Sequence, residues 1–154
     1  MEVVSMRNYS GRNIYSHKPV IKMIVDLGSL AHTPTNKIRG FNNSLLEHFP
    51  GLSDHYCSLG YKGGFIQRLE EGTLVSHVTE HLALELQCIM GYDVHFGKTR
   101  VVEEPYVYYI LYEYSNEACA IEAGYAAAKI VLALARRESI SIEYIEDIDR
   151  KSVV

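Results

Sequence analysis

Runs of alternating and β-branched hydrophobic residues predict several strands. The strongest run, residues 20–27, is typical of a central strand. Residues 106–114 form a second run, in which alternate positions face opposite sides of a sheet. One side is apolar except for Glu113, whose carboxylate needs a metal ion or an arginine as partner unless it lies at a solvated strand end. Shorter strands are expected at residues 2–6 and 93–96.

Hydrophobic residues at helical spacing cover residues 72–91. Leucine, alanine, glutamate and methionine fill this stretch, and either Thr73 or Ser76 can begin a helix there. Gly91 stands where a left-handed C-terminal cap belongs. The pattern therefore predicts one long helix.

A second long helix is predicted over the alanine-rich residues 116–137, with Ser115 as its N-cap. A shorter helix is expected at residues 42–49, and residues 97–100 are expected to form a turn that presents two cations. This order of elements predicts an α+β fold, with a small, mainly antiparallel sheet packed against two long helices.

Composition narrows the class of protein. A chain of 154 residues, 47% hydrophobic and 22% charged, can bury the core of one domain, which we expect over residues 1–138, with a tail at residues 139–154. The net charge of −4 argues against nucleic-acid binding through overall basicity. We expect no membrane-spanning segment and no signal peptide. Three widely spaced cysteines favour a reducing compartment, which we expect to be the cytoplasm, and we expect them to form neither a disulfide framework nor a Cys-type zinc site.

The helix predicted at residues 72–91 carries His77, Glu80 and His81. At about 100° per residue, His81 lies about 40° from His77, and Glu80 lies about 60° to the other side. Two imidazoles one turn apart can hold one zinc ion, and a carboxylate between them can reach a water on that zinc. The order H-x-x-E-H is the inverse of the commoner zinc-protease motif. The spacing indicates zinc ligands at His77 and His81 and a general base at Glu80.

The same helix has a second interpretation that needs no metal. A heptad-like stripe would bury both histidines as hydrogen-bonded core residues, and the helix alone leaves both interpretations open. The members of this stripe are Leu74, His77, His81, Leu84 and Cys88.

A glycine-rich loop precedes the helix at residues 58–65. Its three glycines allow a close approach of the backbone to another group, but the sequence does not match a phosphate-binding loop. A plain surface loop and a loop that faces a substrate are both compatible with this composition, and we favour the second.

Several motifs, in this order, together resemble a known family. The similarity runs from the N-terminus to about residue 137, and it identifies the chain as similar to the N-terminal domain of cyanophycin synthetases. The motifs are R-N-I-Y at 12–15, C-S-L-G-Y-K-G-G-F at 57–65, E-G-T at 71–73, H-V-T-E-H at 77–81, A-L-E-L-Q at 83–87, F-G-K-T-R at 96–100 and Y-E-Y at 112–114.

The resemblance implies a partner and an activity. Cyanophycin is multi-L-arginyl-poly-L-aspartate, in which an isopeptide bond joins an arginine to each aspartate side chain. The full synthetase, expected to be a homo-oligomer, adds both amino acids with ATP and Mg in an ATP-grasp and a Mur-ligase-like domain. We expect both to be absent from this chain, with residues 139–154 leading towards the first. The N-terminal domain holds the polymer. In some members its H-x-x-E-H helix resembles that of pitrilysin-type zinc peptidases, and the domain cuts the polymer internally to make primers.

The resemblance also implies roles for further residues. A later helix supplies a glutamate as third zinc ligand in pitrilysin-type enzymes, which points to Glu117, with Glu113 and then Glu122 as alternatives. The first-turn position of Glu117 is equally explained by the helix dipole. The polymer is expected to contact Lys62, Gly63, Gly64, Lys98 and Arg100, and the three cations are expected to hold its backbone or C-terminal carboxylates. A domain without hydrolysis, which only tethers the polymer, is the alternative.

Overall fold

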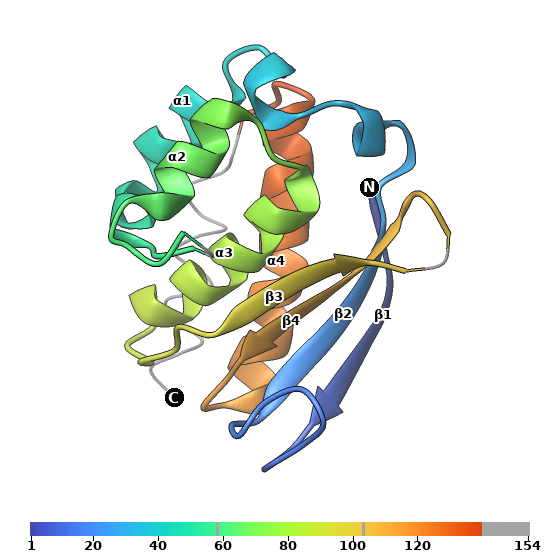
Figure 1. Ribbon diagram of the computed structural model, residues 1–154, viewed down its shortest axis with the longest axis vertical. Coiled ribbons are helices and arrows are strands. Elements are labelled where there is room, and N and C mark those ends of the chain that lie inside the picture. Colours follow the sequence, from blue (N-terminus) through green and yellow to red (C-terminus); the bar gives the residue numbers. More distant parts are fainter. Residues whose placement is uncertain (58, 103, 140–154) are drawn as a thin grey trace.

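The computed structural model describes residues 1–57, 59–102 and 104–139, and within them it contains one antiparallel four-stranded sheet (Figure 1). The strand order is β1-β2-β4-β3, so β2 is central, as its β-branched sequence predicts. The strands are β1 (Glu2–Tyr9), β2 (Val20–Asp26), β3 (Gly97–Val101) and β4 (Val107–Glu113).

Helices cover one face of this sheet. α3 packs against β3 and β4, and α4 packs against β1, β2 and α3, whereas α1 and α2 lie farther from the sheet (Figure 1). The predicted α+β class, with a small antiparallel sheet against two long helices, is confirmed. The helices are α1 (Phe41–His48), α2 (Gly64–Glu71), α3 (Val75–Ile89) and α4 (Glu117–Ala135), with short 3-10 helices η1 (Gly28–His32), η2 (Thr35–Lys37) and η3 (Pro50–Asp54).

The core lies between the sheet and its two long helices. Ile21 and Met23 of β2 and Ile110 and Tyr112 of β4 are fully buried there. The small residues of α4 allow it to lie close to these strands, and the Tyr112 hydroxyl donates a hydrogen bond of 2.7 Å to the Ala120 carbonyl. By length and mean hydropathy, α4 is long and apolar enough to cross a membrane, which the sequence did not lead us to expect. Half of its apolar stretch is buried in the core, as in the core helix of a globular domain.

The edge strand β3 corrects two predictions. Residues 97–100 belong to this strand and do not form a turn, and residues 93–96 do not form a strand. The backbone N–H groups of residues 95 and 96 donate to the side chain of Glu113 instead of to a neighbouring strand. An edge strand with one neighbour tolerates polar residues, so its hydrophobic pattern is weak. β1 is also longer than predicted, because residues 7–9 pair with β2.

The ends of the long helices differ in part from prediction. α2 ends at Glu71 and α3 begins at Val75, with Leu74 as its N-cap, so neither Thr73 nor Ser76 caps this helix. The Thr73 hydroxyl contacts the His77 ring instead. Gly91 follows α3 with φ +97°, which confirms the predicted left-handed position. Beyond residue 139, the predicted tail lies outside the described residues.

Asn116, not Ser115, caps α4. Its side-chain oxygen accepts a hydrogen bond of 3.0 Å from the Cys119 N–H. We predict that Asn116→Ala lowers the free energy of unfolding by about 1 kcal/mol. Ser115→Ala, the matched control, should change it by less than about 0.5 kcal/mol. Urea denaturation of both variants measures this difference, and equal losses would contradict the assignment of the cap.

Candidate metal centre

The first turns of α3 bring its three motif residues to one pocket. Glu80 and His81 are each 5% exposed, and His77 is partly buried. The Nε2 atoms of His77 and His81 are 3.1 Å apart, and Glu80 Oε1 lies 3.8 Å from His81 Nε2. The helical spacing i, i+3, i+4 therefore produces the predicted grouping of two imidazoles and one carboxylate.

The third donor corrects an expectation, because a cysteine, which we did not expect in a zinc site, lies beside the two histidines. Cys57 lies in the segment between η3 and α2, and its Sγ is 3.4 Å from His77 Nε2. Donor atoms of Cys57, His77 and His81 all lie within 4.8 Å of one another, and among the described residues this is the one such group of three or more.

The spacing of these donors fits a tetrahedral ion. With Zn–N near 2.0 Å and Zn–S near 2.3 Å, two nitrogens on one tetrahedral zinc lie about 3.3 Å apart, and a sulfur and a nitrogen about 3.5 Å apart. The distances here are 3.1 Å between the His77 and His81 nitrogens and 3.4 Å from Cys57 to His77. The group could therefore hold a metal ion, and one thiol with two imidazoles is a donor set that suits zinc.

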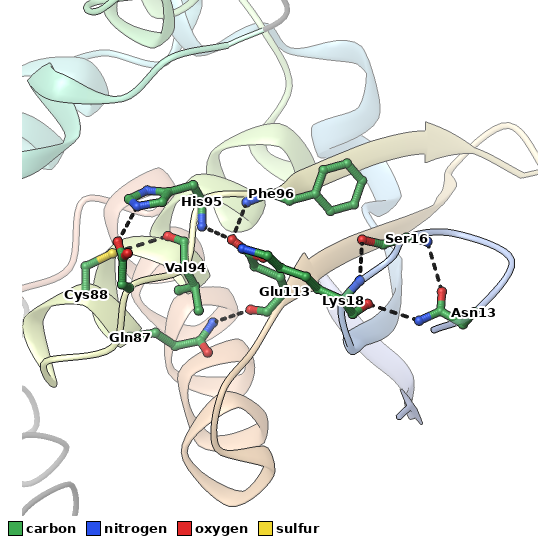
Figure 2. Close-up of polar contacts among 10 residues, drawn as sticks. Asn13, Ser16, Lys18, Gln87, Cys88, Val94, His95, Phe96 and Glu113 are labelled. Carbon is green, nitrogen blue, oxygen red and sulfur yellow. Dashed lines mark hydrogen bonds and ion pairs between the residues drawn. The ribbon is translucent and has the colours of Figure 1, made fainter. Parts of the chain in front are cut away.

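The glutamates considered as third ligand lie elsewhere. Glu117 and Glu122 are exposed on α4, outside the group of three. Glu113 is buried, and its carboxylate accepts hydrogen bonds from the backbone N–H groups of His95 and Phe96, the second at 2.9 Å (Figure 2). Lys18 Nζ lies 3.5 Å from the same carboxylate. The sequence led us to expect a metal ion or an arginine as partner of Glu113. In the structure its partners are two backbone N–H groups and a lysine.

Burial controls the protonation of the motif residues. It lowers the pKa of His77 to about 4, with Arg68 acting in the same direction, and it lowers the pKa of His81 well below 6.5. Both imidazoles are therefore neutral at pH 7, which metal binding requires. Burial raises the pKa of Glu80 to about 7, although the Thr99 hydroxyl and Arg100 oppose this shift. Glu80 can thus both accept and release a proton near neutral pH.

The edge strand β3 fixes the orientation of Glu80. The Thr99 hydroxyl donates a hydrogen bond of 2.5 Å to Glu80 Oε2. A Cβ at Gly97 would lie 2.6 Å from Glu80 Oε1, so only glycine allows the strand to approach this closely. The contact between β3 and Glu80 depends on residues 97–100 being a strand, so it could not be predicted from a turn at these positions.

An open pocket of about 650 Å³ lies beside the three donors. Arg68, Lys98 and Arg100 line it, and Glu80 is the one carboxylate among its described lining residues. Two cations predicted from the sequence are therefore at the site, and Arg68, which we did not predict, joins them.

The glycine-rich loop has a different position from these cations. Among the described residues, Lys62, Gly63 and Gly64 do not line the pocket. Lys62 Nζ lies 3.3 Å from a carboxylate oxygen of Asp54, and Gly63 is the N-cap of α2 with φ +89°. A Cβ at Gly64 would lie 3.4 Å from the Cys57 backbone nitrogen, so this loop packs against the segment that supplies the sulfur.

Comparisons with known proteins agree with the motifs. The family of the cyanophycin synthase-like N-terminal domain matches residues 22–136. The chain is 41% identical over 140 residues to the cyanophycin synthetase of Trichormus variabilis, covering 89% of this chain and 15% of the relative. It is 38% identical over 148 residues to that of Synechocystis sp., covering 95% and 17%. It therefore spans only about a sixth of the length of these relatives, and it belongs to the family of cyanophycin synthase-like N-terminal domains.

Proposed function

We propose that this domain binds the arginine-bearing polyaspartate cyanophycin and hydrolyses it internally with a zinc ion, so that the fragments serve as primers for polymer synthesis. One observation carries the proposal: Cys57, His77 and His81 converge beside a buried carboxylate at the edge of a cation-lined pocket. A merely structural site would bury its donors on all sides, whereas this group borders an open pocket.

Each residue of the site has a separate role in the proposed hydrolysis. Cys57, His77 and His81 would hold the zinc ion, which would polarise the scissile carbonyl and acidify the attacking water. Glu80 accepts a proton from that water and passes it to the leaving nitrogen, because its raised pKa lies near the pH at which it works. Thr99 keeps one oxygen of Glu80 in place while the other, Oε1, stays on the side of His81.

The charge of the pocket suits one part of the polymer. Each arginine branch carries a free α-carboxylate, because only its amino group is used in the isopeptide bond. Lys98 and Arg100, with Arg68, would attract these carboxylates. Arg100 also lies close enough to lower the pKa of Glu80, which supports a role for this cation near the reacting groups.

The same cationic pocket supports a second candidate function, a tether without hydrolysis. Carboxylate binding by Lys98 and Arg100 requires no metal, and metal content separates the two candidates. In either case we propose that the domain works in the cytoplasm beside ATP-grasp and Mur-ligase-like domains of a homo-oligomeric synthetase, which use ATP and Mg.

The donor set generates the first prediction for this site. Cys57→Ser and His77→Ala should each reduce bound zinc from about one equivalent to a small fraction, because each removes one of three ligands. Glu117→Ala, the matched control, should keep its zinc, because this exposed side chain lies outside the group. Elemental analysis after dialysis measures all three. Loss of zinc only in Glu117→Ala would return the third ligand to that residue.

The proposed general base, Glu80, leads to a second prediction for this site. Glu80→Gln should slow polymer hydrolysis by about 10²–10⁴-fold while zinc content stays the same, because glutamine can accept the Thr99 hydrogen bond but not a proton. Size analysis of long cyanophycin should show a rapid fall in mean length with wild type. Glu47→Gln on the exposed side of α1 is the control. An active Glu80→Gln would remove the base from the mechanism, and a zinc-loaded wild type that binds without cutting would favour the tether.

The hydrogen bond from Thr99 generates a prediction for pH. That bond lowers the pKa of Glu80, so Thr99→Val should raise it. Activity requires the ionised carboxylate, which is present above this pKa and lost as the pH falls through it. The acidic limb of the pH–rate profile should therefore move to higher pH in Thr99→Val and stay in place in Thr99→Ser, which keeps a hydroxyl. An unmoved limb in both variants would show that another group controls it.

A further inference from the structure

Both histidines of the donor set use their second ring nitrogen as well. His77 Nδ1 lies 3.0 Å from the Thr73 hydroxyl oxygen, and His81 Nδ1 lies 3.0 Å from Nδ1 of a third histidine, His55. His55 belongs to the segment that follows η3, two residues before Cys57. The two contacts differ in one respect: a hydroxyl can donate or accept, whereas a neutral imidazole nitrogen does only one of these.

A carboxylate determines what His55 can do. His55 Nε2 lies 2.7 Å from Glu85 Oε2, and the two side chains are 15% and 12% exposed. An ionised carboxylate only accepts, so Nε2 of His55 must carry the proton. In neutral His55 the other nitrogen, Nδ1, then has a lone pair and can only accept. When His55 is neutral, the proton between the two Nδ1 atoms therefore belongs to His81.

We propose that Glu85 and His55 are positioning residues that keep the His81 proton on Nδ1 and so leave the Nε2 lone pair for the metal. The role of these residues in metal binding rests on the proposed function, whereas the position of the His81 proton follows from the contacts alone. Thr73 performs no such selection on His77, because its hydroxyl pairs with either form of that ring. His77 can therefore donate to His81 Nε2 without a metal and turn its proton towards Thr73 when a metal binds.

Packing holds this chain of contacts in place. The Phe65 ring stacks on the His81 ring, with centroids 4.0 Å apart and planes 20° apart. A Cβ at Gly51 would lie 2.0 Å from Glu85 Oε1, so the backbone of η3 lies directly on the carboxylate. The alternative is that Glu85 and His55 merely fasten the segment of Cys57 to α3. A fastening role predicts altered stability, but it predicts no particular position for the His81 proton.

Imidazole nitrogen NMR on the metal-free wild-type chain tests the proposal directly. Long-range ¹H–¹⁵N spectra distinguish the Nδ1–H from the Nε2–H form of each histidine. We expect His81 to be entirely in the Nδ1–H form. A predominant Nε2–H form would overturn the proposal, whatever the domain does to the polymer, and this measurement requires no variant to fold.

Variants then test the consequence for the metal. His55→Phe keeps a ring but removes the acceptor, so His81 should become a mixture of both forms and the affinity for Zn²⁺, measured by chelator competition, should fall by about 10–100-fold. His55→Asn offers a carbonyl oxygen to Nδ1–H and should restore most of both. Adding Glu85→Leu to His55→Phe should cause little further loss, because the two residues act through one chain of contacts.

The outcomes separate this inference from the proposed function. Lower stability in His55→Phe with an unchanged His81 form and zinc affinity would assign a fastening role and overturn the inference. If the predicted form and affinity changes are found but wild type leaves cyanophycin uncut, the inference stands and the hydrolytic function fails.

Discussion

The burial of polar atoms along one side of α3 is the constraint on which the rest of the site depends. An unpaired buried polar group costs about 1–3 kcal/mol, so each imidazole and the carboxylate need a partner. Glu80 receives one from β3, and His81 receives one from His55. These partners come from two different elements, so the fold must bring both an edge strand and the segment after η3 against the helix. The remaining nitrogens then face one another and Cys57.

Two buried carboxylates have different tasks in this arrangement. Glu113 binds the backbone N–H groups of residues 95 and 96, directly before β3 begins. This contact determines where the edge strand starts, and so brings Gly97 and Thr99 against Glu80. Both the backbone N–H groups and Lys18 therefore engage the Glu113 carboxylate, which has a structural role. In Glu80, one oxygen accepts a hydrogen bond from Thr99 and the other lies near His81. Glu113 and Glu80 carry the same functional group. Their different surroundings make the first a structural carboxylate and the second the candidate base.

The sequence was informative where hydrophobic spacing carried the signal. Strand β2, helix α4 and the H-x-x-E-H face of α3 were all predictable, because burial imposes a period of two or of about 3.6 residues. β3 was not, because an edge strand with Lys98 and Arg100 reads as a turn. The role of Cys57 was not predictable either, because this residue approaches the histidines from an irregular segment whose path depends on tertiary packing. Its position at the start of the glycine-rich motif was the available signal.

Charge sets how a polymer could lie in this pocket. A divalent cation deprotonates a coordinating thiol, so Cys57 with two neutral imidazoles would leave one net positive charge, which ionised Glu80 balances. Arg68, Lys98 and Arg100 then make the pocket positive as a whole. The guanidinium groups of a cyanophycin chain would be repelled, while their α-carboxylates would be attracted. A bound polymer should therefore turn its carboxylates towards the cations and extend its guanidinium groups into solvent. Proteins that bind a free arginine side chain place carboxylates around it, and the described lining of this pocket has only Glu80, which the proposed reaction requires for another purpose.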